Sequence, residues 1–153
     1  MRFVGARPTE EPARSLLAGM RDEVAELYDD LDIDGPDMPK AGPAEFAAPH
    51  GDFLVGEDEE GAAICCGGIK RLPDGACEFK RMYVVPAARG QGVARRLLAA
   101  LEARARELGY TIARLDTGPR QPHSHHLYVS AGFRDIENFN ANPMATYFGE
   151  KAL

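Results

Sequence analysis

Residues 79–101, FKRMYVVPAARGQGVARRLLAAL, constrain the fold of this chain most, because they predict a strand, a glycine-bearing turn and a helix in that order. The segment 82–85 is rich in β-branched and aromatic side chains, which suit a buried sheet. Pro86 cannot donate to a strand ladder, so the strand is expected to end there. Beyond the turn, apolar residues recur at the spacing of one helical face: Val93, Leu97, Leu98, Leu101, Ala105 and Leu108. Gly109 stands where a left-handed helix cap is expected.

The turn between that strand and that helix predicts a binding site for an anion. Gly90 and Gly92 allow the backbone to turn tightly and to approach a ligand without a Cβ in the way. The free N–H groups of a helix start, its dipole, and the charges of Arg89, Arg95 and Arg96 favour a phosphate or a diphosphate. The alternative is an ordinary connecting loop whose glycines only satisfy turn geometry. A P-loop would end in Gly-Lys-Ser/Thr, and a Rossmann turn would need a small residue where Arg95 stands, so neither pattern matches.

Two short motifs resemble the signatures of a known family. Residues 89–94, RGQGVA, are similar to the Q/R-x-x-G-x-G/A signature of the GNAT superfamily of acyl-CoA-dependent N-acetyltransferases. Downstream, residues 127–133, LYVSAGF, resemble that family's second hallmark, LY-x-x-x-GF. Both occur in the family's order, and the resemblance extends over essentially the whole chain, with the N-terminal third the least diagnostic. It implies a single GNAT-like acetyltransferase domain over residues 1–153.

Composition limits the size and class of the protein. A chain of 153 residues is most economically one domain with its own core, and its hydrophobic fraction of 44% and charged fraction of 27% are ordinary for a soluble globular protein. It has no run of about 18 apolar residues and no apolar secretory segment at its start, so a cytoplasmic protein without a membrane span is expected. A net charge of −6 argues against nonspecific nucleic-acid binding and mildly favours cationic partners.

The three cysteines, Cys65, Cys66 and Cys77, suit reduced thiols within strands. Cys65 and Cys66 are adjacent, so they should point to opposite faces of a strand, which disfavours their binding one ion together. Buried, unreactive thiols are therefore expected.

The remaining pattern predicts a mixed α/β sheet. Residues 2–7 form a plausible first strand, and Thr9, followed by two glutamates and Pro12, predicts a helix start. The apolar stripe of that helix is expected to be Leu17, Met20, Val24, Leu27 and Leu31. Further strands are expected at 52–57, 61–71, 76–85, 111–117, 133–137 and 146–150, with a short helix at 122–131. Because 61–85 has the pattern of a β-meander, we expect a mostly antiparallel central sheet flanked by helices, as the GNAT resemblance also implies.

The segment 29–51 is rich in Asp, Pro and Gly and predicts a loop with a short helical turn near 44–47. Its alternating aspartates imitate the start of an EF-hand calcium loop, but the twelfth position is Ala41 instead of a bidentate Glu, and two prolines break the geometry. Calcium binding is therefore not expected. A solvated loop is the favoured interpretation, and the alternative is that these carboxylates attract a positively charged acceptor. The resemblance implies that this region borders the acceptor pocket.

The resemblance implies that acetyl-CoA is the co-substrate. Main-chain amides of the turn would hold its diphosphate, and the matching residues are Arg89, Gly90, Gln91, Gly92, Val93, Ala94 and Arg95. The main chain of Met82 and Val84 would pair with the pantetheine arm, and one of those amides could polarise the thioester carbonyl. Gln121 stands where the family often has an Asn that contacts the same arm.

The resemblance also implies catalytic roles. Tyr128 is the hallmark tyrosine, and a phenol with a pKa near 10 can pass a proton to a departing thiolate. Its alternative role is that of a core aromatic. For the base that deprotonates the amine, we rank Glu78 on the central strand slightly ahead of Asp116 on the following strand. Lys80 and Arg81 could equally neutralise Glu78 and leave it an ordinary surface charge.

Two further polar groups are candidates for the site. Among the three histidines of 123–126, only His123 and His126 have helical i, i+3 spacing, and no carboxylate or cysteine motif completes a ligand set, so no metal is expected. Exposed histidines are the default, although one could relay protons. Asn138, Asn140 and Asn142 could line the acceptor pocket, but turn formation is the favoured interpretation.

The resemblance therefore implies an N-acetyltransferase that transfers an acetyl group directly from acetyl-CoA to a primary amine of a small molecule or peptide. No nucleophilic elbow or Cys–His pair supports a covalent enzyme intermediate. The alternatives are a non-catalytic acyl-CoA-binding or sensor module and, third, a nucleotide-binding regulatory domain. Dimers are common in the family, so a homodimer is one expected assembly.

Overall fold

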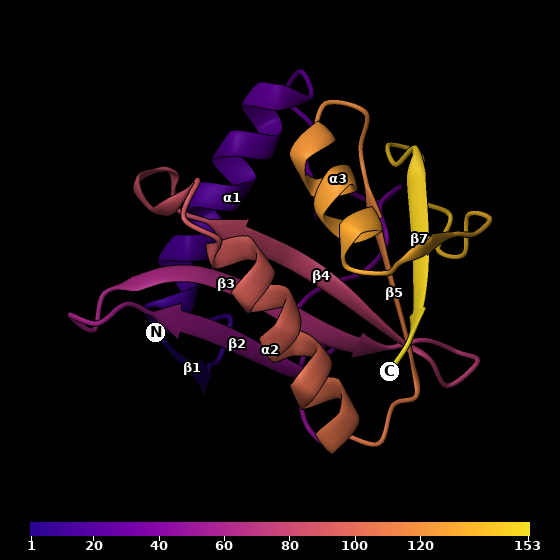
Figure 1. Cartoon of the computed structure of the whole chain (residues 1–153). Coiled ribbons are helices and arrows are strands. Elements are labelled where there is room, and N and C mark those ends of the chain that lie inside the picture. Colours follow the sequence, from indigo (N-terminus) through magenta and orange to yellow (C-terminus); the bar gives the residue numbers. More distant parts are fainter.

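A seven-stranded sheet runs through the computed structural model, which describes residues 1–153 (Figure 1). In chain order the elements are β1 Arg2–Gly5, α1 Ala13–Leu27, β2 Asp52–Glu57, β3 Ala63–Arg71, β4 Cys77–Val84, the 3-10 turn η1 Pro86–Ala88, α2 Val93–Glu107, β5 Ile112–Thr117, α3 Pro122–Ser130, β6 Arg134–Asp135 and β7 Tyr147–Ala152. None of the helices combines the length and the apolar character that a membrane crossing requires.

The strand order is β1-β2-β3-β4-β5-β7-β6, and every neighbouring pair is antiparallel except β4 and β5. That parallel pair is short: only Cys77 opposite Ala113 and Glu78 opposite Arg114 are in register. Beyond these residues the two strands diverge, which is visible where β4 and β5 separate toward the top of Figure 1. The predicted mixed, mostly antiparallel sheet flanked by helices is confirmed.

A bulge in β4 changes which side chains face which side of the sheet. Gly68 of β3 lies opposite Lys80, but Cys66 lies opposite Tyr83, so β4 contains one extra residue. The extra residue lies at Arg81, whose φ is +59°. Strict alternation would place Phe79 and Met82 on opposite faces, yet both pack into the same core cluster.

Helices cover both faces of the sheet (Figure 1). Leu97, Leu98 and Leu101 of α2 belong to a cluster of 17 buried residues that also contains Phe79 and Tyr128. On the other face, buried apolar residues of α1 pack with β2 and β3: Leu16 and Leu17 with Phe53, Val55 and Cys66. The apolar stripes that predicted these two helices are therefore the surfaces that seal the sheet.

The first helix is shorter than expected at both ends. It begins at Ala13, because the carboxylate of Glu11 and not the hydroxyl of Thr9 accepts an amide hydrogen bond, from Ser15 at 3.3 Å. It ends at Leu27, since Asp29 and Asp30 adopt positive φ values of 55° and 65°, which leave the helical conformation. Leu31 lies outside the helix but still packs against its last turn.

The three cysteines are fully buried. Cys65 belongs to the cluster beneath α2 and Cys66 to the cluster beneath α1, so the expected opposite orientation is confirmed. Burial raises the pKa of Cys65 to about 11 and the pKa values of Cys66 and Cys77 to about 12. The thiols are therefore neutral, and poor nucleophiles, near neutral pH.

We expect Ellman's reagent at about pH 8 to label none of the three thiols of the folded protein within minutes, because a raised pKa keeps them protonated and burial excludes the reagent. The same protein in guanidinium chloride should give three equivalents of thiolate. Rapid labelling of even one thiol in the folded protein would show that a strand opens readily.

Candidate active site

The turn between β4 and α2 leaves an open row of amides. Gly90 and Gly92 have φ values of +75° and +77°, and a Cβ added at either would meet no atom within 4 Å. No side chain caps α2, and the first helical amide with a backbone acceptor is that of Arg96, which donates to the Gly92 carbonyl at 3.2 Å. The amides of residues 93–95 at the positive end of the helix dipole therefore fit a diphosphate.

Two of the three arginines around this turn, Arg89 and Arg95, bind other parts of the protein, whereas Arg96 is exposed. Arg89 Nε donates to the Val84 carbonyl at 3.0 Å, and its guanidinium pairs with Glu23 of α1 at 2.6 Å. Arg95 donates to the Ser130 hydroxyl of α3 at 2.7 Å. These contacts fix the turn against α1 and α3, so the main-chain amides and the exposed Arg96 are the groups left to meet an incoming anion.

Tyr128 lies in α3 at the opening between the diverging strands. Its hydroxyl is 3.7 Å from the sulfur of Met82, and its ring stacks on Tyr147 with centroids 6.4 Å apart. The LYVSAGF segment holds it there: Gly132 has φ +97°, and the amide of Phe133 donates to the Tyr128 carbonyl at 3.0 Å. Burial raises the pKa of Tyr128, so the phenol keeps its proton at neutral pH.

A cavity of about 110 Å³ opens between α1, the segment that follows it, and the diverging ends of β4 and β5. Tyr128, Met82, Gln121 and Asp116 all line it. Its other walls are mainly apolar and include Met20, Val24, Leu31, Ile33, Met38 and Met144.

Glu78 is fully buried, so its interpretation as an ordinary surface charge is wrong. Its Oε2 accepts hydrogen bonds from Lys80 Nζ at 3.1 Å and Asn140 Nδ2 at 2.7 Å, while Oε1 has no partner. Burial is the largest influence on its pKa and raises it, and the charge of Lys80 opposes this shift. Glu78 lies behind the cavity and does not line it.

Asp116 is the carboxylate that lines the cavity. Its Oδ2 accepts from Asn140 Nδ2 at 2.7 Å and from Asn142 Nδ2 at 3.0 Å, and lies 3.9 Å from Lys80 Nζ. The two carboxylates that sequence reasoning proposed are thus joined through Lys80 and Asn140 in one polar cluster.

Comparison with known proteins identifies the family. Residues 19–133 match the Acetyltransferase (GNAT) family. The chain belongs to the GNAT family. An uncharacterised N-acetyltransferase of Schizosaccharomyces pombe is 34% identical over 117 residues, covering 75% of this chain and 72% of that protein. An IAA acetyltransferase of Azospirillum brasilense is 36% identical over 126 residues, which cover 76% of this chain and 80% of that protein.

Solved structures agree with this assignment. The putative acyl-CoA N-acyltransferase of Klebsiella pneumoniae is 30% identical, with a TM-score of 0.76, and the alignment covers 99% of this chain and 97% of that one. The GNAT chain described here is therefore an acetyl-CoA-dependent acyltransferase.

The asparagine segment of this GNAT enzyme does more than form turns. Asn138 does form one, since its Oδ1 accepts the amides of Asn140 and Ala141 at 3.2 and 2.8 Å. Asn140 and Asn142, however, direct their side-chain amides to the carboxylates of Glu78 and Asp116, and Asn142 also lines the cavity. Sequence reasoning missed this role; the only signal was the regular spacing of three asparagines in one loop.

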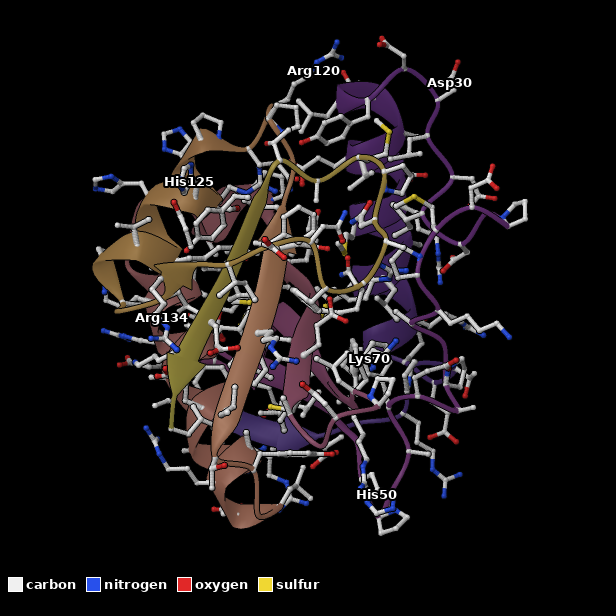
Figure 2. All side chains as sticks on the ribbon, turned by 90° about the vertical axis from the view of Figure 1, so that its right-hand side faces the viewer. Asp30, His50, Lys70, Arg120, His125 and Arg134 are labelled. Carbon is white, nitrogen blue, oxygen red and sulfur yellow. The ribbon has the colours of Figure 1, made fainter.

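Gln121 in the GNAT enzyme contacts the end of α1. Its Oε1 accepts from the Tyr28 hydroxyl at 3.0 Å and the Gly118 amide at 3.3 Å. Figure 2 shows Arg120 and Asp30 at the same end of the molecule, where the segment before α3 meets the segment after α1. Arg120 donates there to the Leu27 carbonyl at 2.7 Å. Tyr28, which sequence reasoning did not single out, therefore helps to hold the start of α3.

The histidines of α3 are exposed on the outside of the GNAT fold. His125, labelled in Figure 2, packs its ring against Tyr147 in a tilted arrangement with centroids 4.3 Å apart. No group of three or more His, Cys, Asp or Glu side chains in the structure is arranged to hold a metal ion.

Proposed function

We propose that this enzyme is an N-acetyltransferase that transfers the acetyl group of acetyl-CoA directly to a primary amine of a small molecule or peptide, with Tyr128 as general acid. One observation carries the proposal: a single cavity at the strand opening is lined both by a buried, protonated phenol, Tyr128, and by a carboxylate, Asp116. An acid for the leaving thiolate and a base for the attacking amine are the two proton-transfer groups that this reaction needs.

Binding of the co-substrate is assigned to the β4–α2 turn and the end of β4. The open amides of the turn fit the diphosphate, with Gly90 and Gly92 leaving room for it. The main chain of Met82 and Val84 is proposed to bind the pantetheine arm. The Val84 carbonyl already accepts from Arg89 Nε, so the Met82 carbonyl is the better candidate to accept from the pantetheine amides. The thioester carbonyl needs an N–H donor, and the amides of Met82 and Val84 are both candidates for that role.

The proposed reaction couples one acyl transfer to proton transfers through Asp116 and Tyr128. The acceptor ammonium gives one proton to Asp116, which passes it to solvent. The neutral nitrogen forms a bond to the acetyl carbonyl carbon, the carbon–sulfur bond breaks, and Tyr128 protonates the departing sulfur. The nitrogen loses its second proton as the amide forms, and this proton restores the phenol. The products are the N-acetyl acceptor, coenzyme A and one proton.

The position of Asp116 changes the ranking of the two candidate bases. Asp116 lines the cavity, whereas Glu78 reaches it only through Lys80 and Asn140. We therefore propose Asp116 as the base and Glu78 as the group that holds Lys80 and Asn140 in place.

Replacement of Asp116 by Asn is expected to lower kcat about 100-fold, the typical contribution of a general base. Glu78→Gln should lower it less than about 10-fold, because the substituted group does not contact the acceptor. Steady-state release of coenzyme A measures both. Asp74→Asn in the exposed β3–β4 turn is the matched control and should leave kcat unchanged. A larger loss in Glu78→Gln than in Asp116→Asn would assign the base to Glu78 instead.

A panel of primary amines tests the function itself, with coenzyme A release as the readout and acetyl-CoA binding measured by calorimetry. Turnover with at least one amine supports the proposal. Binding of acetyl-CoA without turnover on any amine would support the sensor module, which membership in a family of transferases disfavours. Tight binding of mononucleotides with no preference for coenzyme A would support the regulatory domain.

The single-domain organisation, the homodimer and the cytoplasmic location of the protein stay predictions.

A further inference from the structure

The cavity that contains Asp116 also contains a guanidinium. Arg81 lines it, at the bulge of β4, with only 8% of its side chain exposed. Its positive φ of 59° is a conformation that residues other than glycine seldom adopt, and such strained positions are often found at functional sites. The bulge is what directs this charge into the opening between the strands.

The charge of Arg81 is only partly compensated. Its Nη2 donates to the Ile33 carbonyl at 3.2 Å and to Asp34 Oδ1 at 3.3 Å. Asp34 is shared, since its other oxygen accepts from Arg21 Nε at 2.8 Å. One carboxylate therefore serves two guanidinium groups, and Nε and Nη1 of Arg81 make no hydrogen bond within the protein. This end of the cavity can bind an anion.

The opposite charge faces the cavity at Asp116. Its two hydrogen-bond donors, Asn140 and Asn142, are neutral amides, and both donate to Oδ2, so Oδ1 has no hydrogen-bond partner within the protein. The nearest cation, Lys80, also lines the cavity, and its Nζ is closer to Glu78, at 3.1 Å, than to Asp116, at 3.9 Å. Asp116 therefore remains available to a cation in the cavity.

The side of the cavity that α1 and the segment after it form is apolar. It is formed by Met20 and Val24 of α1, by Leu31, Ile33 and Met38 of the following segment, and by Met144. Thioether and branched aliphatic side chains favour an aliphatic group of moderate size over a polar one.

We propose that the acceptor is a small α-amino acid with an apolar side chain, whose ammonium binds Asp116 and whose carboxylate binds Arg81. The proposal rests on the proposed function, because it names the amine that the same cavity accepts. The apolar wall holds the side chain. The reaction is the one described above, with the α-nitrogen as nucleophile and an N-acetyl amino acid as product. Arg81 contacts the carboxylate only and takes part in no bond that forms or breaks.

The wild-type enzyme tests this with matched amines. Leucine and methionine carry the carboxylate, leucinamide replaces it with a neutral amide, and 3-methylbutylamine lacks it. We expect kcat/KM for leucine to exceed kcat/KM for leucinamide about 30-fold or more. Leucinamide lacks the carboxylate that binds Arg81, and losing one partner of a buried charge pair has an effect of that size. Equal kcat/KM for leucine and leucinamide would overturn the carboxylate site and leave acetyl transfer standing.

The variant Arg81→Gln locates the discrimination. It should raise KM for leucine about 30-fold with little change in kcat, and leave KM for leucinamide nearly unchanged. Arg2→Gln, at an exposed arginine paired with Glu57 on the sheet edge, is the matched control. An unchanged leucine-to-leucinamide ratio in a folded Arg81→Gln enzyme would overturn the assignment. If Arg81→Gln does not fold, the wild-type comparison alone decides.

Thermal shift in the presence of coenzyme A separates this proposal from the proposed function. Stabilisation by leucine and not by leucinamide, without turnover of any amine, would support the carboxylate site and overturn acetyl transfer. Turnover of polyamines or of 3-methylbutylamine at or above the rate for leucine would support acetyl transfer and overturn the amino-acid acceptor.

Discussion

Replacing Tyr128 by Phe is expected to lower kcat about 100-fold or more, because the substitution removes the proton donor for the departing thiolate. Acetyl-CoA affinity should change less than about 2-fold, since affinity is assigned to the β4–α2 turn and not to the phenol. The hydroxyl lies 3.7 Å from the Met82 sulfur and also interacts with the Ser124 side chain, so its loss should cost no more than about 1 kcal/mol of stability. Steady-state coenzyme A release and calorimetry measure the two quantities separately.

Tyr147→Phe is the matched control, because Tyr147 is buried in the same aromatic cluster and its hydroxyl donates to a backbone carbonyl, that of Phe133. It should leave kcat nearly unchanged. The pH profile of kcat gives a second readout. Burial raises the pKa of Tyr128 above its ordinary value of 10.0, so the phenol stays protonated up to at least pH 10. Ionisation of Tyr128 should therefore cause no fall in kcat between pH 7 and pH 10. Full turnover in Tyr128→Phe would remove the phenol from the mechanism.

Gly92→Asp is expected to weaken acetyl-CoA binding about 100-fold, which corresponds to roughly 3 kcal/mol. The substitution places a carboxylate at the N-cap of α2, where it competes for the amides and repels a diphosphate. Folding should be nearly unaffected. Aspartate tolerates the left-handed conformation, here φ +77°, and is a preferred N-cap, while a Cβ at this position meets no atom within 4 Å. Calorimetry with acetyl-CoA and thermal unfolding measure the two effects.

The control is Gly75→Asp in the turn between β3 and β4. Gly75 also has a positive φ, +91°, and open space around a new Cβ, but it lies in a hairpin turn and not at the start of α2. The same glycine-to-aspartate change there should leave acetyl-CoA affinity intact. Unchanged affinity in Gly92→Asp would mean that another part of the protein binds the diphosphate.

Features set by neighbouring residues were predictable from the sequence. The central strand ends at Val84, just before Pro86, and α2 runs from Val93 to Glu107 with Gly109 at φ +93°. These features depend on interactions within one or two turns: a missing donor, an apolar repeat at helical spacing, and a residue without a Cβ. The open amide turn and the position of Tyr128 in a short helix ended by glycine follow from the same local rules.

The bulge at Arg81 was harder to predict from the sequence. Apolar and polar residues alternate in a strand with one buried face, and the neighbouring charges of Lys80 and Arg81 interrupt that alternation. This interruption was the only sign of the bulge in the sequence. The register with β3 shows that the strand gains one residue there. The bulge in turn decides that Met82 faces Tyr128 and that Arg81 lines the cavity.

The amino-acid sequence thus encodes the strand, the turn and the helices, because each arises from contacts between near neighbours in the chain. The tertiary structure decides the environment of the carboxylates. Asn140 binds Glu78 across 62 positions of sequence and Asp116 across 24, and these contacts exist only because β4 and β5 pair briefly and then separate. Burial of Glu78 and access to Asp116 depend on how those strands and the asparagine loop pack, which no local pattern specifies.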